Sequence, residues 1–317
     1  MSADAPRTDP AGDPKLRRLD ERLGLAISRA GSSPRTLVTY ARDHVSVRTP
    51  SRPDFRDGNT IDLESPPVPG DLTAWVDRFG ETTGRLGVRH VQLRWETPLR
   101  PDAPAEVPAT DPELSRACAH LGMQLHATTV LLLGEPVAPP EAPAELVTVT
   151  PPSSVPRPRG AGVEVRADDT PVEVERRWHA ISVLDRYATG ETPDDWRASD
   201  PEFTAWAVDV QRELAAAGRA TIWLALRHGG PVAKAVLLHD RQGLATIEDV
   251  VVHPVHRRIG IASALTHRAV AAHLAAEPGS RIGLGADPAG PADHLYRRLG
   301  FRPHATVWTA LRLPASR

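Results

Sequence analysis

The feature that most constrains this sequence is a segment that occurs twice. The residues from Leu121 read LGMQLHATT and those from Leu299 read LGFRPHATV, so both copies follow Leu-Gly-apolar-x-x-His-Ala-Thr. A short helical pattern precedes each copy, and a strand pattern precedes each helix. Shared residues with matching flanking elements favour a duplicated unit over chance similarity of one helix-to-strand joint. We therefore expect two related halves, of which the first is the more diverged.

A proline-dense segment separates the two copies. The chain has 317 residues, which is enough for two domains with separate cores. Residues 135–160 have a composition typical of a semi-rigid linker, although a long surface loop inside one domain is the alternative. We expect an N-terminal domain at 1–134, a linker at 135–160 with a short strand at 146–149, and a C-terminal domain at 161–317. Residues 1–15 are polar and rich in Pro and Asp, and we expect them to be disordered.

Charge and cysteine content exclude several classes of protein. The 38 basic and 40 acidic residues nearly cancel, so we expect neither a nucleic-acid partner nor an anionic membrane surface. The single cysteine, Cys118, excludes an internal disulfide. Apolar stretches are far shorter than the roughly 20 residues that cross a bilayer, and no apolar signal region opens the chain. We expect a cytoplasmic protein, and the excess of arginine over lysine is typical of a GC-rich bacterial genome.

Hydrophobic periodicity predicts alternating helices and strands. The helical patterns cover residues 16–29, 72–85, 112–120, 172–186, 202–217, 261–274 and 291–299. The strand patterns cover residues 88–95, 127–133, 163–166, 221–227, 232–238, 245–252, 281–286 and 305–311. Residues 54–64 and 65–70 read as loops. Antiparallel strands followed by a strand-helix-strand unit predict an α/β fold, with a mixed sheet and helices on both faces.

The most informative segment is a strand, loop and helix over residues 247–265. A β-branched strand enters a proline-containing loop, and a helix opens at Gly260. The first N–H groups of a helix and its dipole attract anions, and Gly260 and the small Ala262 let a pyrophosphate approach the backbone closely. Arg257 and Arg258 add positive charge. This pattern alone also describes an ordinary helix N-terminus with exposed arginines.

A second segment lies about thirty residues further on, where residues 292–301 read ADHLYRRLGF. In this order and separation, the two segments resemble the GNAT-type acyl-CoA N-acyltransferase family. Arg257-x-x-Gly260-x-Ala262 matches the family signature Gln/Arg-x-x-Gly-x-Gly/Ala, and residues 292–301 match its closing Ala-x-x-Leu-Tyr-x-x-Leu-Gly-Phe. The resemblance covers about residues 160–313. It implies a GNAT fold in two tandem copies, with a degenerate N-terminal half and a catalytic C-terminal half.

The resemblance also implies roles for individual residues. Main-chain pairing to the pantetheine arm is implied for Val250, Val251 and Val252. A backbone cradle for the pyrophosphate is implied for Arg257, Arg258, Ile259, Gly260, Ile261, Ala262 and Ser263. Tyr296 is placed near the thioester sulfur. Ala289 stands where the family often has Asn, so a side-chain contact to the cofactor is lost there unless Asp287 substitutes.

The chemistry of amide formation needs two proton transfers beyond positioning. The attacking amine must lose a proton, and the departing thiolate benefits from an acid. Tyr296 is the candidate acid, with aromatic packing as its alternative role. Glu248 and Asp249 are the candidate bases, and alternation along a strand allows only one of them to face the cleft. The resemblance slightly favours Glu248. In the alternative, both are surface carboxylates and a water chain removes the proton.

Other chemically notable residues have simpler interpretations. His253 and His256 are three apart but have no third ligand nearby, so solvated loop histidines are expected and no metal. Cys118 lies on an apolar helix and reads as buried core. Several residues in the helical region that walls the acceptor site in this family are either acceptor contacts or core, namely Trp178, Tyr187, Trp196, Trp206, Asp194 and Asp195.

These observations predict an N-acetyltransferase with acetyl-CoA as co-substrate and no metal. The acetyl group would pass directly to a primary amine of a small molecule or protein within a ternary complex. One alternative is a catalytically silent CoA-binding sensor or scaffold module. Another is an enzyme similar to mycothiol synthase, which is a tandem GNAT enzyme of similar length. We expect a monomer or homodimer, and the sequence does not identify the acceptor.

Overall fold

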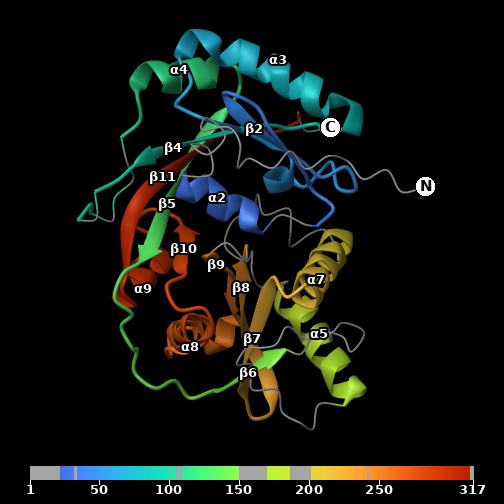
Figure 1. The fold of residues 1–317 in the computed structure, drawn as a ribbon, viewed down its shortest axis with the longest axis vertical. Coiled ribbons are helices and arrows are strands. Elements are labelled where there is room, and N and C mark those ends of the chain that lie inside the picture. The colour runs from blue at the N-terminus through green and yellow to red at the C-terminus, as the bar shows by residue number, and fades with distance from the viewer. Residues whose placement is uncertain are drawn as a thin grey trace. The chain divides into compact units, whose positions relative to one another are not determined.

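The computed structural model describes residues 22–31, 34–100, 102–104, 106, 109–149, 170–185, 201–240 and 243–314 (Figure 1). The expected disorder of residues 1–15, the strand at 163–166 and part of the helix at 16–29 lie outside these residues. The chain divides into two compact units. Unit 1 contains residues up to 131, residues 285–293 and residues from 303 onward, and unit 2 contains residues 132–284 and 294–302.

Unit 1 contains a sheet with the strand order β1-β2-β3-β4-β11-β5. Its strands are β1 (Leu37–Tyr40), β2 (His44–Arg48), β3 (Thr60–Leu63), β4 (Val91–Pro98), β5 (Gln124–Leu133) and β11 (Phe301–Arg312). Its helices are α2 (Leu23–Ala30), α3 (Leu72–Thr83) and α4 (Pro112–His120). Strand β3 is parallel to β4, while the pairs β1–β2, β2–β3 and β4–β11 are antiparallel.

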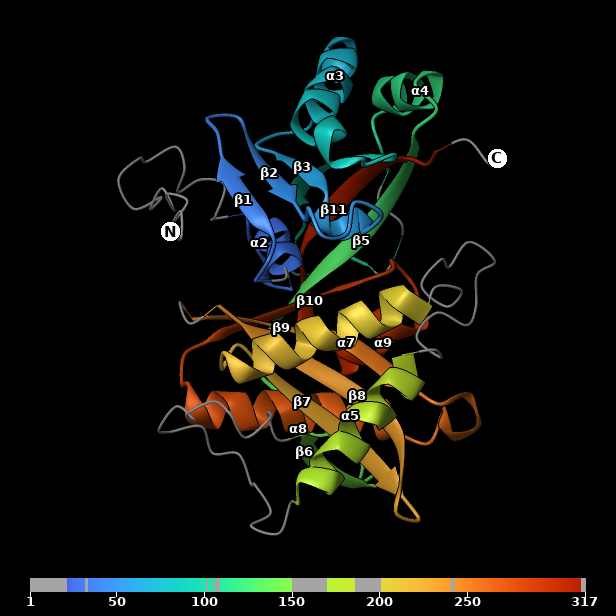
Figure 2. The same ribbon diagram turned by 90° about the vertical axis from the view of Figure 1, so that its right-hand side faces the viewer.

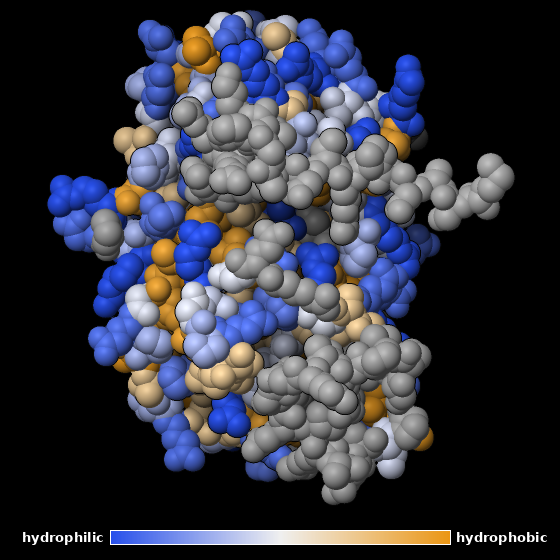
Figure 3. Space-filling model, in the orientation of Figure 1, coloured by the Kyte–Doolittle hydropathy of each residue, from blue (hydrophilic) through white to orange (hydrophobic). Residues whose placement is uncertain are grey.

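Alternation along β4 gives the two faces of this sheet different chemistry. Leu93 and Trp95 are buried against side chains of α3 and α4, whose outer sides are largely hydrophilic (Figure 3). Arg94 and Glu96 alternate with them and lie on the face that α2 covers. Glu96 Oε2 accepts hydrogen bonds from the backbone N–H groups of Gly24 and Leu25 at 2.8 and 3.1 Å. One face of β4 therefore packs in the apolar core, and the other binds α2 through polar groups.

Unit 2 contains a second sheet with the strand order β10-β9-β8-β7-β6. Its strands are β6 (Glu145–Val149), β7 (Ala220–Arg227), β8 (Gly230–His239), β9 (Leu244–Val252) and, in large part, β10 (Arg281–Ala286). Its helices are α5 (Pro171–Asp185), α7 (Pro201–Ala216), α8 (Ile261–Ala276) and most of α9 (Pro291–Arg298). Strands β9 and β10 are parallel, and the pairs β6–β7, β7–β8 and β8–β9 are antiparallel.

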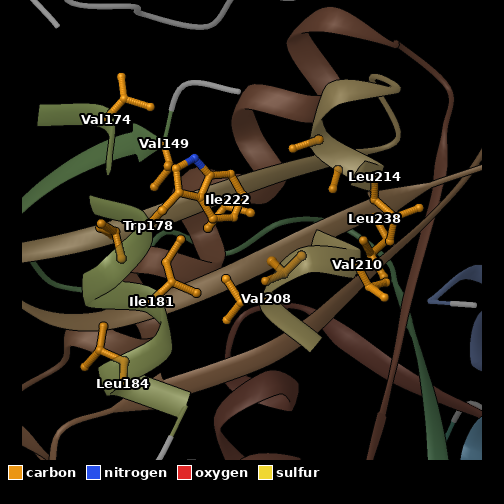
Figure 4. Packing of buried hydrophobic residues seen from close by; sticks show 14 residues of the cluster. Val149, Val174, Trp178, Ile181, Leu184, Val208, Val210, Leu214, Ile222 and Leu238 are labelled. Atoms are coloured by element: carbon orange, nitrogen blue, oxygen red, sulfur yellow. The ribbon is translucent and has the colours of Figure 1, made fainter. Parts of the chain in front are cut away.

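Helices cover both faces of the unit 2 sheet. Figure 2 shows α5 and α7 side by side over β7 and β8, with α8 on the opposite face. Figure 4 shows the core beneath α5 and α7, where Trp178 lies among aliphatic side chains such as Ile181 and Ile222. Trp178 is fully buried, and Trp206 is partly buried against the same cluster. Trp178 therefore has the core role that the sequence left open.

The strand in the proline-dense segment and most other elements form where the sequence predicted them. The strand expected at 146–149 is β6, which pairs antiparallel with β7 of unit 2. The loop expected at 54–64 is wrong at Thr60–Leu63, where β3 forms, and β1 and β2 were not predicted. These strands have only four or five residues. Polar Thr60 and Asp62 are buried in β3 because they have hydrogen-bond partners, so no simple apolar pattern marks the strand.

The duplicated segment forms the same local structure twice. Helix α4 leads through Gly122 into β5, and helix α9 leads through Gly300 into β11. Both glycines have positive φ, 67° and 98°, which is the usual conformation of a glycine that ends a helix. The strand β11 pairs with β4 along Ala305–Arg312 and so belongs mainly to unit 1. The two units therefore do not follow the chain order assumed in the boundaries 1–134 and 161–317, and that assignment of domains remains a prediction.

Candidate active site

A bulge interrupts β9 where the candidate bases lie. Lys234 of β8 pairs with Val251, and Val236 pairs with Glu248, so one residue of β8 opposes two of β9. Asp249 is one of these two and has a φ of 49°, in the left-handed region. A bulge leaves part of the ladder unpaired and bends the strand. The strand therefore changes direction just before the three valines.

No described strand pairs with the other edge of β9 along the same stretch. The parallel pairing with β10 joins Leu244–Thr246 to Arg281–Gly283 and does not continue beyond Thr246. Main-chain groups of residues 247–252 therefore have no registered partners in β10. An open strand edge of this kind can pair with an extended ligand. The sequence placed Val250, Val251 and Val252 in that role, and all three lie on this stretch.

The chain then forms a concave turn at the start of α8. Arg258 and Gly260 both have positive φ, 63° and 87°, and Ile261 is the first residue of the helix. The N–H of Ala264 donates to the carbonyl of Gly260 at 3.0 Å. The preceding N–H groups, of Ile261, Ala262 and Ser263, have no partner within the helix. No side chain among the described residues caps this end, so it offers donors and a positive dipole to an anion.

Hydrogen bonds tie the loop before this helix to the strands. The Arg257 Nε–H donates to the Val252 carbonyl at 3.0 Å, and the His253 N–H donates to the Val232 carbonyl at 2.9 Å. Arg258, Ile259 and Gly260 are exposed beyond them. The predicted phosphate loop is therefore held at its base and open at its tip.

Two histidines lie close together in this loop, beside an arginine. His253 and His256 rings are 5.7 Å apart, and Arg227 Nη1 lies 3.2 Å from His256 Nδ1. Within the described part of the chain, no group of three or more potential metal ligands occurs. A guanidinium beside the ring also disfavours a cation at that place.

Tyr296 and Glu248 lie near one another in unit 2. Tyr296, on α9, is only 8% exposed and packs against the ring of Phe301. Burial and the nearby Glu248 carboxylate both raise the pKa of the Tyr296 hydroxyl. The hydroxyl therefore keeps its proton at neutral pH and can act as a hydrogen-bond donor.

Asp249 contacts polar side chains of α7 and β8. Gln211 of α7 donates a hydrogen bond from Nε2 to Asp249 Oδ2 at 3.0 Å. Lys234 Nζ lies 3.9 Å from the same oxygen, and it also forms an ion pair with Asp185 at the end of α5. Sequence reasoning did not identify Lys234, Gln211 or Asp185. A usable signal was Lys234 itself, which is one of only two lysines and lies in an otherwise apolar strand.

Other candidates are placed as follows. Asp287 is exposed in the turn between β10 and α9, and Ala289 in the same turn has a φ of 57°. Burial raises the pKa of the Cys118 thiol, and this residue lies in the core beneath α3 and α4, as the sequence suggested. The possible acceptor contacts Tyr187, Trp196, Asp194 and Asp195 lie outside the described residues.

Comparison with known proteins gives the same fold class as the sequence motifs. Residues 218–303 match the family model described as an acetyltransferase (GNAT) domain. No curated protein matches the sequence. Among solved structures, a GCN5-related N-acetyltransferase from Kribbella flavida has a TM-score of 0.52 at 16% identity, covering 94% of this chain and 96% of that one. A GCN5-related N-acetyltransferase from Sphaerobacter thermophilus has a TM-score of 0.50 at 16% identity, covering 95% and 93%.

A further similar structure is that of a protein of unknown function. It is a functionally unknown conserved protein from Staphylococcus epidermidis, with a TM-score of 0.62 at 11% identity, covering 87% of this chain and 93% of that one. At these identities the likeness shows the fold alone. The fold likeness, together with the match of residues 218–303 to the acetyltransferase (GNAT) domain model, confirms the predicted fold class. None of the described helices is both long and apolar enough to cross a membrane.

Proposed function

We propose that this protein is an N-acetyltransferase that moves an acetyl group from acetyl-CoA to a primary amine. The proposal rests on one continuous stretch of main chain. The open edge of β9 leads from its bulge into the uncapped N-terminus of α8 at Gly260. An extended arm followed by a diphosphate has the shape and charge to occupy this path. Tyr296 and Glu248 lie near one another beside it.

The residues along this path fit CoA. The main chain of Val250, Val251 and Val252 would pair with the pantetheine arm. The N–H groups at the start of α8 would donate to the pyrophosphate, and a Cβ built on Gly260 has only Ala142 within 4 Å, at 3.9 Å. Among the described residues, no atom closely approaches this position. Acetyl-CoA, when bound there, supplies the thioester.

Direct transfer assigns a proton task to each of two side chains. The amine nitrogen attacks the thioester carbonyl carbon, a C–N bond forms and the C–S bond breaks. Glu248 accepts the proton that the amine loses. Tyr296 donates a hydrogen bond to the departing sulfur. Because the pKa of its hydroxyl is raised above that of an ordinary thiol, stabilisation of the thiolate is the larger part of this role, and solvent completes the protonation.

One observation favours the second candidate, a CoA-binding module without catalysis. Ala289 has a left-handed backbone, which Asn and Gly adopt more readily than alanine, and it replaces the Asn expected there. A lost side-chain contact at this turn would weaken cofactor positioning. Binding without turnover distinguishes the module from the enzyme.

Calorimetry with CoA and acetyl-CoA tests the proposal. Wild-type protein is expected to release heat on binding both, and Gly260→Trp to abolish it because the indole fills the phosphate position. Gly279→Trp is the matched control, since Gly279 lies beyond the other end of α8, also has positive φ, and has open space around it. Thiol release with a panel of primary amines then tests transfer. No binding by the wild type would refute the proposal, and binding without thiol release would establish the silent module.

A further inference from the structure

A buried lysine connects the bulge of β9 to the two helices on the same face of the sheet. Lys234 has a completely buried side chain, in a chain that has almost no lysine. Its Nζ forms an ion pair with Asp185 of α5, and it lies 3.9 Å from Oδ2 of Asp249. Gln211 of α7 donates to the same oxygen of Asp249. Four elements of unit 2 therefore meet at Asp249.

The ammonium of Lys234 lies unequally between the two carboxylates. Lys234 Nζ is closer to Asp185, which is 13% exposed, than to Asp249, which is 36% exposed. Lys234 therefore compensates the charge of Asp249 only weakly, and Asp249 is the more accessible of the two carboxylates. No other cation is recorded beside Asp249 in the described part of the chain.

A second, independent observation is an acceptor atom without a donor. Gln211 is 6% exposed, and no group in the described residues donates to its Oε1. The hydrogen bond from Nε2 to Asp249 fixes the amide, so Oε1 is held in the same cluster. A buried oxygen left without a donor is unfavourable unless a ligand or water supplies one. A carboxylate and an amide oxygen together suit a group with several N–H donors.

We propose that Asp249 binds the ammonium group of the acceptor, which makes the substrate class an alkylammonium with no carboxylate beside its amine. Gln211 and Lys234 act as positioning residues. This inference rests on the proposed transferase function and deepens it. The bound R–NH3⁺ first releases one proton to Glu248 or water. The amine then forms the C–N bond as the C–S bond breaks, the second proton leaves the nitrogen, and the thiolate becomes a thiol.

The bulge places this carboxylate where it is needed. The left-handed conformation of Asp249 belongs to the same stretch of β9 whose opposite edge is open to an extended ligand. The exposed carboxylate of Asp249 beside that edge attracts a cationic amine and repels a carboxylate. For a zwitterionic amino acid, repulsion between Asp249 and the carboxylate of the amino acid would offset the attraction between Asp249 and its ammonium.

The test compares acceptors and two charge-removing variants. The panel contains n-hexylamine, cadaverine and spermidine as cations, with glycine and glutamate as amino acids. Asp249→Asn keeps the size of the side chain, and Asn also tolerates positive φ, so the bulge is retained. Asp209→Asn is the matched control, because Asp209 is exposed on α7 and its substitution removes the same charge. The amine KM of Asp249→Asn is expected to rise about tenfold or more, while its Kd for acetyl-CoA and that of the control stay unchanged.

N,N-Dimethylhexylamine provides a readout that a purely structural role would not change. Its protonated form keeps an N–H donor, its tertiary nitrogen cannot form a stable amide, and it is expected to compete with n-hexylamine in the wild type but not in Asp249→Asn. Equal amine KM values in the variant and wild type would overturn the inference. So would a preference for glycine or glutamate, or no turnover of any cationic amine by protein that binds acetyl-CoA. A wild type that does not bind acetyl-CoA would instead overturn the proposed function.

Discussion

The Glu248 carboxylate lies close enough to Tyr296 to raise, together with burial, the pKa of the tyrosine hydroxyl. These residues are on β9 and α9, and the polypeptide between them forms α8 and β10. Each had been assigned a proton-transfer role from the sequence. Their proximity gives the proposed reaction a proton acceptor and a hydrogen-bond donor within one region of unit 2.

Tyr296→Phe tests the role of the hydroxyl. We expect kcat to fall about 10²-fold or more, because the departing sulfur loses its donor while the ring keeps its packing against Phe301. The Kd for acetyl-CoA should be unchanged. Tyr40→Phe, on β1 of unit 1, is the matched control and should retain full activity. A Tyr296→Phe variant with wild-type kcat would exclude the hydroxyl from the reaction.

The pH dependence of kcat gives a second test. Because burial and Glu248 raise the pKa of Tyr296, its hydroxyl stays protonated across the range in which amines lose their protons. We therefore expect kcat to rise with pH and to show no descending limb from Tyr296 up to about pH 10. Steady-state rates from pH 6 to 10 measure this. A descending limb near pH 9 that disappears in Tyr296→Phe would contradict the prediction.

Gly300 permits a close approach that no other residue allows. It has a φ of 98°, and a Cβ added there would collide with the carbonyl oxygen of Glu135. The Gly134 N–H also donates to the Gly300 carbonyl at 3.0 Å. We expect Gly300→Ala to lower the free energy of unfolding by more than about 4 kcal/mol, measured by urea denaturation.

The control for this variant has the same backbone conformation without the collision. Gly279 has a φ of 88° and nothing within 4 Å of an added Cβ, so Gly279→Ala should cost only about 1–2 kcal/mol. Equal losses in the two variants would mean that conformation alone, and not contact with Glu135, makes Gly300 necessary.

The buried triad of unit 1 predicts an acid-dependent loss of stability. Asp62 Oδ2 lies 2.8 Å from Arg29 Nη1, and Asp62 Oδ1 lies 2.7 Å from Arg94 Nε. Burial by itself would raise the pKa of Asp62, but the two guanidinium groups outweigh burial and hold it below the usual value. The folded state therefore binds this proton less readily than the unfolded state. The stabilisation is complete above the unfolded-state pKa of about 3.9 and is lost as pH falls through the folded-state value.

Asp62→Asn removes the anion and leaves two buried cations. We expect it to lower the free energy of unfolding at pH 7 by about 3–5 kcal/mol, and we expect the difference from wild type to shrink below about pH 4. Asp102→Asn is the control, because its ion pair with Arg100 is exposed and should contribute less than about 1 kcal/mol. Denaturation at pH 7 and pH 3 measures both. A difference between Asp62→Asn and wild type that is as large at pH 3 would be evidence against this linkage.

The local chemistry of the chain could be predicted from the sequence alone. A glycine that begins α8, a motif that forms α9 and the repeated Leu-Gly joint depend on neighbouring residues, whose backbone preferences act over one turn of chain. The strands of unit 2 followed from the same kind of local pattern. Cys118 and Trp178 were recognisable as core candidates because they occur in apolar or helical stretches.

Only the tertiary structure decided which distant residues meet. Strand β3 pairs with β4, which follows it only after helix α3, and β11 joins unit 1 because it pairs with β4. The meeting of Lys234 with Asp249 depends on the register of β8 against β9 and on a bulge within it. Register is set by cooperative packing of whole elements, so no short run of residues encodes it. The sequence thus determined the turn at Gly260, whereas the tertiary structure determined which charged side chains meet at the bulge of β9.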